Sequence, residues 1–471
     1  MSEAKKAPDL RENKMGKMPL GKLLFNMALP LVLSMLVQAL YNVVDRVYVA
    51  GYSQNAVTAL SLAFPVQNLQ IGFATGAAVG MNSLLSKSLG EGDRERANRA
   101  AGNGIFLTLL FAVAFMLFGF FGAGAYYEMQ NISPETAKAG TEYTSICCIF
   151  TAGVFISILC ERLLQASGKT IYTMYTQGTG ALLNIILDPL FIYGFEPLGI
   201  PEMGAAGAAV ATVIGQWVGA VMGIIFNLTK NTDVKFAVRY LRPDKEIMGK
   251  ILTVGVPSII MMAIGSVMNF GMNQIFLGFD QIGETASGVF GIYFKLQSFF
   301  FMPLFGINNA AISILAFNYG ARKPERITGT LKRTVGTAMI IMLAGLAVFQ
   351  IFPDVLMGIF STSEDASGGA FVNMGISALR IISLMFPMAA VGIALGGAAF
   401  PAMGNGLYST ITSLCRQLIV LLPAAYLLSL TGDVHAVWWA FPIAEVVSLV
   451  ITLVLYDKVY RNKIKPMFAQ N

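Results

Sequence analysis

Long apolar segments alternate with short polar ones along almost the whole chain. Each apolar segment reaches about 20 residues or more, the length at which one helix spans the hydrocarbon core of a bilayer. Twelve segments meet this condition, which predicts an all-α polytopic membrane protein with twelve transmembrane helices. The expected spans are 23–51, 55–86, 95–125, 140–166, 170–194, 204–228, 247–279, 285–318, 328–353, 372–400, 405–430 and 435–457.

The second half of the chain repeats the first. Ala28-Leu29-Pro30 matches Gly255-Val256-Pro257 at an offset of 227 residues, and Glu95-Arg96 matches Glu325-Arg326 at an offset of 230. An even number of spans in each half makes the two halves parallel repeats, related by an axis along the membrane normal. The predicted parts are a tail (1–22), an N-lobe (23–228), a linker (229–246), a C-lobe (247–457) and a second tail (458–471).

Basic residues are concentrated on one side of the predicted membrane. Of the 32 Lys and Arg residues, 27 fall in the two tails and in the connections on the same side, whereas the opposite connections carry only Lys138. Because basic loops resist translocation, both termini and the linker are expected to be cytoplasmic. This predicts a multi-pass protein of the inner (cytoplasmic) cell membrane of a prokaryote. The distribution also accounts for the net charge of +6 without a nucleic-acid partner.

Composition excludes disordered, collagen-like and disulfide-stapled secreted proteins, and it argues against a soluble domain. Only 12% of the residues are charged, against about 25% in an ordinary soluble domain. The four cysteines lie inside apolar runs without metal-ligand spacing, which indicates small buried side chains: Cys147, Cys148, Cys160 and Cys415. The chain has no phosphate loop, zinc motif or Ser-His-Asp set. We therefore expect no cofactor and no metal, and we expect that H⁺ or Na⁺ supplies the energy.

Two polar stripes stand out within the apolar spans of the first half. Gln38, Asn42 and Asp45 share one face of the first span, and the fifth span carries Gln177, Asn184 and Asp188. A charged group at the bilayer centre costs at least about 2.5 kcal/mol, so each carboxylate needs a partner, a proton or a hydrated cavity. We predict one shared N-lobe cavity that binds a cation reversibly, with a kink at Asp188 caused by Pro189. In the alternative, Asp45 pairs with Arg46, or the two acids tie helices together.

The second half carries different chemistry. Met272 occupies the position that corresponds to Asp45, while Asn269 and Asn273 remain on one face of the seventh span. Glu445 could neutralise Arg416 or Lys295, and Glu161 is interpreted as a structural partner of Arg162. Internal pairing is favoured over substrate contact for these charges.

Taken in order, several motifs resemble the MATE (multidrug and toxic compound extrusion) family, over about residues 20–460. They are Ala28-Leu29-Pro30, Tyr41-Asn42-Val43-Val44-Asp45, 164–169 (LQASGK), 184–191 (NIILDPLF) and Asn318-Tyr319-Gly320. The resemblance implies two six-helix lobes that open alternately to the two sides, and export of organic cations against inflowing H⁺ or Na⁺. In the DinF-like and MepA-like branches it also implies a cation-coupling site, at Asp45, Asn184 and Asp188 in this sequence.

The sequence and the resemblance together predict a monomeric secondary antiporter of small lipophilic cations, in contact with membrane lipid. Its cavity would be lined by polar side chains from both halves: Gln38, Tyr41, Asn42, Gln177, Asn269 and Asn273. A related superfamily member, a lipid-linked oligosaccharide flippase, is the first alternative, because Lys295, Arg380 and Arg416 could make a cationic cavity. An intramembrane aspartyl protease that uses Asp45 and Asp188 is the second, although its usual Tyr-Asp and Gly-x-Gly-Asp contexts are missing.

Overall fold

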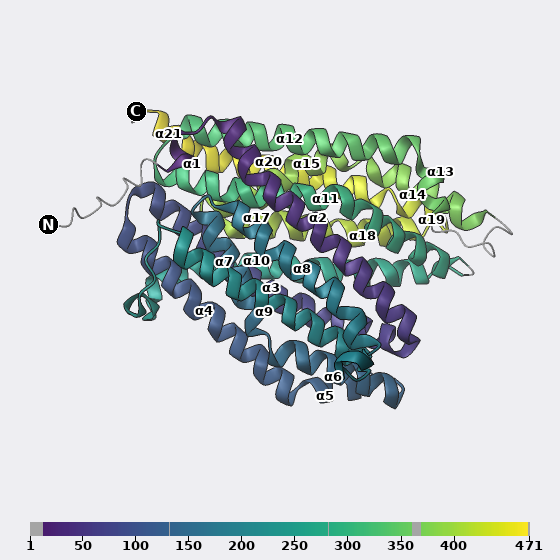
Figure 1. Ribbon diagram of the computed structural model, residues 1–471. Helices are drawn as coiled ribbons and strands as arrows, with labels where there is room; N and C mark the ends of the chain where they lie inside the picture. Colours follow the sequence, from purple (N-terminus) through teal and green to yellow (C-terminus); the bar gives the residue numbers. More distant parts are fainter. Residues whose placement is uncertain (1–12, 131, 281, 360–368, 470–471) are drawn as a thin grey trace.

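The computed structural model describes residues 13–130, 132–280, 282–359 and 369–469, apart from six side chains within them: Asn42, Val43, Arg46, Gln54, Leu198 and Ala370. Within these ranges the elements are helices, and the sole strand-like pairing is an isolated bridge between Phe195 and Ile200. Figure 1 shows two groups of long helices side by side, with the first and last described helices, α1 (Lys14–Lys17) and α21 (Lys465–Phe468), at the same end of the molecule.

The N-lobe is built from the first half of the chain. Its elements are α1 (Lys14–Lys17), α2 (Leu20–Tyr52), α3 (Gln54–Glu91), α4 (Arg94–Phe121), α5 (Ala123–Glu128), α6 (Pro134–Ile149), α7 (Ala152–Ala166), α8 (Thr170–Ile192), η2 (Glu196–Leu198) and α9 (Ala205–Lys230). The segment that follows α9 contains the short 3₁₀ helix η3 (Val238–Leu241).

The C-lobe begins at α10 (Lys245–Leu277). It continues with α11 (Gly283–Gly320), α12 (Pro324–Ile351), α13 (Pro353–Gly358), α14 (Ala370–Ser383), α15 (Phe386–Ala394), η5 (Leu395–Ala399), α16 (Phe400–Ala402), α17 (Gly406–Leu414), η6 (Cys415–Ile419), α18 (Leu421–Ser429), α19 (Val434–Val437), α20 (Ala440–Val459), η7 (Tyr460–Ile464) and α21 (Lys465–Phe468). The elements η5, η6 and η7 are π-helical turns inside otherwise α-helical segments.

The fold class predicted from the sequence is confirmed. Within the described residues, eight helices are long and apolar enough to cross a membrane, and two bent helix pairs raise the number to ten. The remaining two expected spans are α3, of 38 residues, and α8, of 23 residues, which carry more polar side chains. All twelve predicted segments therefore form helices of membrane-spanning length.

Two expected spans, 140–166 and 372–400, are bent rather than continuous. Each pair of helices meets at 46°, α6 with α7 and α14 with the α15–α16 segment. In the second pair the cause is Pro387 in the first turn of α15, which cannot donate a backbone hydrogen bond. In the first pair, the Gln70 amide of α3 donates to the Cys147 carbonyl at 3.2 Å and to the Thr151 hydroxyl. That amide takes the place of a helical N–H donor and opens the helix.

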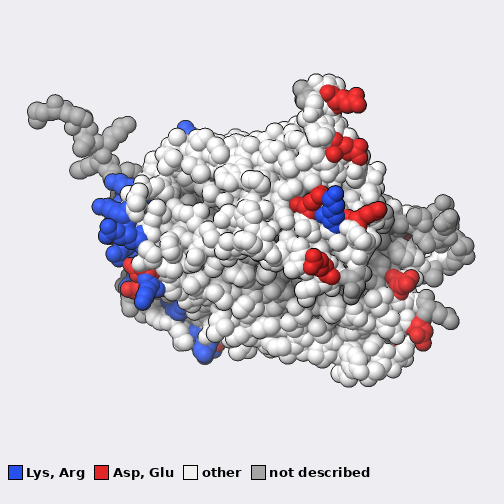
Figure 2. Space-filling model, turned by 90° about the horizontal axis from the view of Figure 1, so that it is seen from below, with Lys and Arg blue, Asp and Glu red and all other residues white. Residues whose placement is uncertain are grey.

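Charged residues divide the molecule into two ends. Figure 2 shows Lys and Arg gathered at one end and mainly Asp and Glu at the other. The basic end contains α1, α21, the N-terminus of α4 and the segment between α9 and α10 (Figure 1). The charge segregation inferred from the loops is thus a property of the folded surface.

The two lobes touch through their first two long helices. A Cβ added at Gly90 of α3 would lie 1.9 Å from the Phe317 carbonyl oxygen, and one at Gly320 of α11 would lie 2.1 Å from that of Lys87. These glycines are repeat mates at the offset of 230, so the two contacts are copies of one another. A second copied pair consists of Gly76 against Ile259 and Gly306 against Val32. These reciprocal contacts show that a pseudo-two-fold axis relates the two lobes, as the sequence repeat predicts.

These close approaches all lie in the halves of the helices nearest the basic end. The cores of the two lobes merge there as well, since one buried cluster includes Met27 of α2, Ile251 of α10 and Phe317 of α11. The described part of the chain is therefore joined most tightly at the basic end.

Replacing Gly90 or Gly320 with alanine should destabilise this junction. Because the new methyl group meets backbone rather than a flexible side chain, we expect a loss of about 1–3 kcal/mol for each. Thermal unfolding of the purified protein measures the effect. Gly336→Ala in α12 is the matched control, since its Cβ meets nothing within 4 Å, and it should be neutral or stabilising by up to about 1 kcal/mol. A Gly90→Ala protein as stable as wild type would contradict the assigned contact.

The orientation of the basic end is testable by cysteine labelling in intact cells. Lys235 is exposed at the basic end, and Glu196 is exposed in η2 between α8 and α9. Three native cysteines are buried and Cys415 is half-buried, so their background labelling should be low. A membrane-impermeant thiol reagent should label Glu196→Cys and leave Lys235→Cys unmodified until the cells are opened. Equal labelling of both from outside would exclude cytoplasmic termini.

Candidate functional site

Asp188 and Asn184 lie one turn apart on α8, facing the interior of the N-lobe. The side chain of Asp188 is fully buried and that of Asn184 is 3% exposed. The Asn184 amide donates to Asp188 Oδ1 at 3.1 Å. The expected kink does not break α8, because Pro189 stands only three residues before the last helical residue, Ile192. The carbonyl of Ile185 nevertheless loses its helical donor, since proline has no N–H.

A close approach of α8 and α9 brings a third polar residue to this pair. Gly180 and Gly215 face each other so tightly that a Cβ on either would come within 3.0 Å of the other's carbonyl oxygen. This spacing lets the Asn184 amide reach the Thr212 hydroxyl of α9 at 3.3 Å. Thr212 was not predicted, because only the packing of the two helices brings it near.

The second carboxylate comes from α2, which packs along α8. Asp45 is half-buried and interacts electrostatically with Asp188. The hydroxyl of Tyr41 interacts with both acids and with the side chain of Gln38. The structure therefore brings together most of the predicted N-lobe set. The side chains of Asn42 and Arg46 lie outside the described residues.

The α8 pair offers unused acceptor capacity. Asn184 Oδ1 and Asp188 Oδ2 are buried and have no hydrogen-bond partner within the described part of the chain. Buried oxygens without donors are costly, because desolvation is not repaid. A proton or a small cation on Asp188 would remove that cost, which makes this pair the strongest candidate ion site.

Gln177 belongs to a different cluster from the one predicted. Its amide donates to Glu161 of α7 at 2.7 Å, and Ser157 donates to the same carboxylate at 3.4 Å. Eleven residues separate Gln177 from Asp188, which is roughly 16 Å along the helix. The helical spacing places the two side chains on the same face but at different depths, so Gln177 lies apart from the Asp188–Asn184 pair, and its role in lining the cavity stays a prediction.

Glu161 and Arg162 interact electrostatically, as predicted, but among the described residues their charged groups form no ion pair within 4 Å. Arg162 instead donates to Gln165 at 3.0 Å, one turn further along α7. Neighbouring residues on a helix point about 100° apart, so each side chain finds a different partner. Glu161 is 6% exposed and is held by neutral donors.

The C-lobe has an ion pair in its interior. Arg416 Nη1 lies 3.9 Å from Glu445 Oε1, with Glu445 2% and Arg416 27% exposed. Arg416 belongs to the π-helical turn η6, and Glu445 belongs to α20. Of the two partners considered from the sequence, the structure has Arg416. Lys295 is exposed on α11, and Met272, the counterpart of Asp45, is fully buried.

The two C-lobe asparagines are engaged within their own lobe. Asn269 donates to the Gly265 carbonyl of its own helix at 2.9 Å, and Asn273 accepts from Ser287 of α11 at 2.7 Å. Both remain half-buried on α10. Asn273 therefore ties α10 to α11, in addition to any role in lining a cavity.

A family model described as MatE matches residues 30–190 and 257–427. The chain belongs to the MatE family. The two matched stretches fall in the two lobes, as the repeat requires. It is consequently a membrane transport protein and not an enzyme, and the aspartyl-protease alternative is set aside.

Individual relatives agree with this assignment. The multidrug export protein MepA of Staphylococcus saprophyticus is 24% identical over 92% of this chain and 93% of its own length. The solved structure of a multidrug resistance MATE transporter of the MOP superfamily, in an outward-facing conformation, is 25% identical, with a TM-score of 0.87 over 100% of both chains. A MOP superfamily transporter from Pyrococcus furiosus, whose reverse pocket polarity suggested a different function, is 25% identical with a TM-score of 0.86 over 99% of each chain.

Further polar residues of this MatE N-lobe were missed from sequence. Tyr143 of α6 interacts electrostatically with Asp45 and accepts a hydrogen bond from Gln67 of α3 at 2.9 Å. Gln67 and Gln70 are polar residues within an apolar span. Their presence there could have predicted that this side of α3 faces the N-lobe interior. Tyr143 gives no such signal in an ordinary amphipathic stretch.

Removing the C-lobe acid should destabilise the protein. Glu445→Gln leaves Arg416 without its counter-ion, and we expect a loss of about 1–3 kcal/mol, less than the roughly 3–5 kcal/mol of a fully buried pair, because Arg416 is partly exposed. Thermal unfolding and the yield of monodisperse protein report the change. The double variant Arg416→Gln/Glu445→Gln removes both charges and should recover part of the loss. A stable Glu445→Gln protein without transport would instead make Glu445 an ion or substrate residue.

Proposed function

We propose that this chain is a secondary active multidrug exporter that antiports lipophilic organic cations against H⁺. The observation that carries the proposal is the buried Asp188–Asn184 pair of α8, with Asp45 of α2 close by. The MepA name of its relatives supports drug export as the task. The transporter would work as a monomer in the cytoplasmic membrane, in contact with lipid.

The electrostatics of the pair support competition between ion and drug. Two carboxylates in an apolar lobe cannot both remain ionised without a large desolvation cost. Either a proton or the positive charge of a drug removes that cost, and the two ligands thereby exclude each other. Such exclusion is what antiport requires, since a ligand shifts an equilibrium only through differential affinity for its states.

The junction at the basic end supports the direction of opening. Backbone contacts such as Gly90 against Phe317 join the lobes there, whereas they are not found in the opposite halves of the described helices. With the basic end cytoplasmic, this state would expose its N-lobe site to the outside. Protonation of Asp45 and Asp188 would release drug outward, and repacking of α2 around Pro30 would follow.

A flippase of lipid-linked oligosaccharides is the second candidate. It is favoured by the exposure of Lys295 and Arg380 within C-lobe spans, since exposed cations could bind a phosphate group. The reverse pocket polarity of the Pyrococcus transporter, taken to suggest a different function for that protein, supports keeping this alternative. Lys295→Gln/Arg380→Gln would abolish a flippase and leave export of a cationic dye intact.

Asp188→Asn should abolish drug export while the protein stays folded, because Asn has the shape of the protonated acid. The direct measurement is proton release from detergent-purified protein on addition of a cationic dye. Wild type should release protons, Asp188→Asn should lose at least about 90% of the signal, and Asp45→Asn should lose most of it.

Glu196→Gln is the matched control, since it removes an exposed acid at the acidic end of the molecule. It should release protons and transport as wild type does. Proteoliposomes with an imposed pH or sodium gradient identify the ion, and transport driven by sodium alone would overturn the choice of H⁺. Full release and transport in Asp45→Asn/Asp188→Asn would overturn the N-lobe site itself.

A further inference from the structure

The segment between the lobes forms a pocket of about 510 Å³ at the basic end. Its walls come from the first turns of α4, from η3 with the residues after it, and from the start of α10. The pocket lies just outside the apolar part of the helices. Arg99 precedes Ile105, where the apolar run of α4 begins, by six residues, or roughly 9 Å.

Cations outnumber anions in the lining of this pocket. Arg99, Arg239, Arg242 and Lys245 face Glu95 and Asp244. Both acids are already engaged, Glu95 with Tyr240 at 3.0 Å and with Arg239 at 3.9 Å, and Asp244 with Arg99 at 3.3 Å. Arg242 and Lys245 are exposed and form no ion pair within the described residues. Their positive charge is available to a ligand.

A second pocket of about 390 Å³ adjoins the first and shares Arg239 and Tyr240 with it. Its lining includes apolar side chains, among them Leu228, Val234 and Phe236. Leu228 is 64% exposed, and Val238 of η3 is 82% exposed. A cationic pocket beside an apolar one fits an amphiphilic anion better than a free, fully polar ion.

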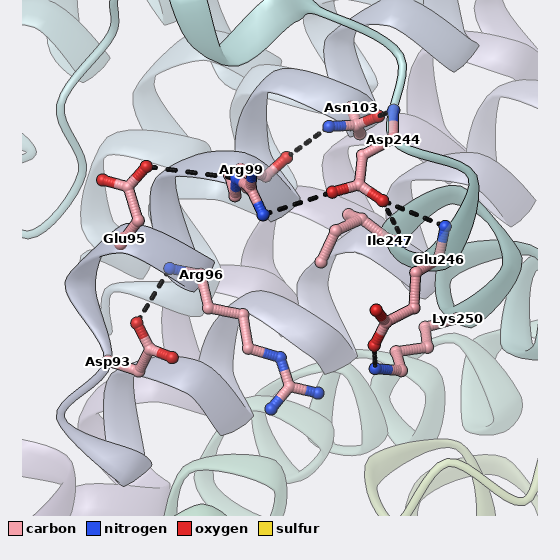
Figure 3. A network of polar contacts seen from close by, with 9 residues as sticks. All are labelled: Asp93, Glu95, Arg96, Arg99, Asn103, Asp244, Glu246, Ile247 and Lys250. Carbon is pink, nitrogen blue, oxygen red and sulfur yellow. Dashed lines mark hydrogen bonds and ion pairs between the residues drawn. The ribbon is translucent and has the colours of Figure 1, made fainter.

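The cationic pocket also belongs to both lobes. Figure 3 shows Asp244 between α4 and α10, where it pairs with Arg99 and accepts from the backbone N–H groups of Glu246 and Ile247 as the N-cap of α10. Asn103 of α4 in turn accepts from the Asp244 N–H at 2.8 Å. A ligand at this place touches the N-lobe through Arg99 and the start of the C-lobe through Lys245.

We propose that this pocket binds the phosphate headgroup of an acidic phospholipid. Arg99, Arg242 and Lys245 contact the phosphate, and an acyl chain lies along Leu228 and Phe236. Binding neutralises the cations where the lobes meet and holds their basic ends together. The site is separate from the N-lobe carboxylates and does not depend on which ion drives transport.

The test compares lipids on the purified full-length protein in detergent. Native mass spectrometry and the shift in melting temperature measure binding of phosphatidylglycerol and phosphatidylcholine with identical chains. Wild type should bind phosphatidylglycerol at least about 10-fold more tightly. Arg242→Gln/Lys245→Gln should weaken phosphatidylglycerol binding by about 30-fold, since each cation near an anionic headgroup contributes roughly fivefold in affinity. Phosphatidylcholine binding should not change.

Lys458→Gln/Lys465→Gln is the matched control, because it removes two exposed cations at the same end but outside the pocket. It should bind phosphatidylglycerol as wild type does. Equal weakening in both double variants would overturn the pocket in favour of diffuse surface attraction. Equal affinity for the two lipids in wild type would overturn the proposal as well. Inorganic phosphate that binds and stabilises as strongly as phosphatidylglycerol would assign the pocket to a soluble phosphate and overturn the lipid.

Discussion

Burying a carboxylate inside an apolar helix bundle is the constraint on which the N-lobe depends. Ionised Asp188 would have to be compensated by donors, and the described structure supplies one amide, from Asn184, while Oδ2 has none. The surroundings therefore favour the protonated or cation-bound form. The tight Gly180–Gly215 contact sets Thr212 beside Asn184. In the proposed mechanism, this incomplete solvation is what makes ion binding reversible.

The pseudo-two-fold axis extends beyond the helices to the segments that precede each lobe. The Arg326 guanidinium of α12 donates to the carbonyls of Met15 and Met18 at 2.9 and 2.8 Å, so the segment before α2 is fixed to the C-lobe. In the other direction, α4 of the N-lobe holds the segment before α10, where Asn98 accepts from the Lys235 N–H at 2.8 Å. Each lobe thus forms hydrogen bonds to the segment that precedes the first long helix of the other lobe. Because α4 and α12 occupy equivalent positions in the repeat, the two sets of contacts are related by the same repeat.

Much of this architecture could be predicted from the sequence, because its determinants are local. Apolar length fixes the spans, and the offset matches of Gly76, Gly90 and their mates encode the lobe contacts. The spacing of Asn184 and Asp188 on one helix fixes their contact. Residues on different helices were harder to place. Thr212 and Tyr143 depend on packing, and Gln177 shares a face with Asp188 but lies too far along the helix to reach it. The break between α6 and α7 depends on Gln70, which belongs to another span.

The lobes use their charges in opposite ways. In the N-lobe, Asp188 has the Asn184 amide as its described donor and interacts electrostatically with a second acid, Asp45, so an incoming positive charge would stabilise it. In the C-lobe, Glu445 already has Arg416 at 3.9 Å, and the apolar Met272 stands at the position that corresponds to Asp45. A neutral pair gains little from a further cation, since binding one would leave a net positive charge in an apolar interior. In the proposed mechanism, the same backbone repeat supplies one lobe that responds to protons and one that serves as its fixed counterpart. This asymmetry is what the proposed antiport mechanism, with a single coupling site in the N-lobe, requires.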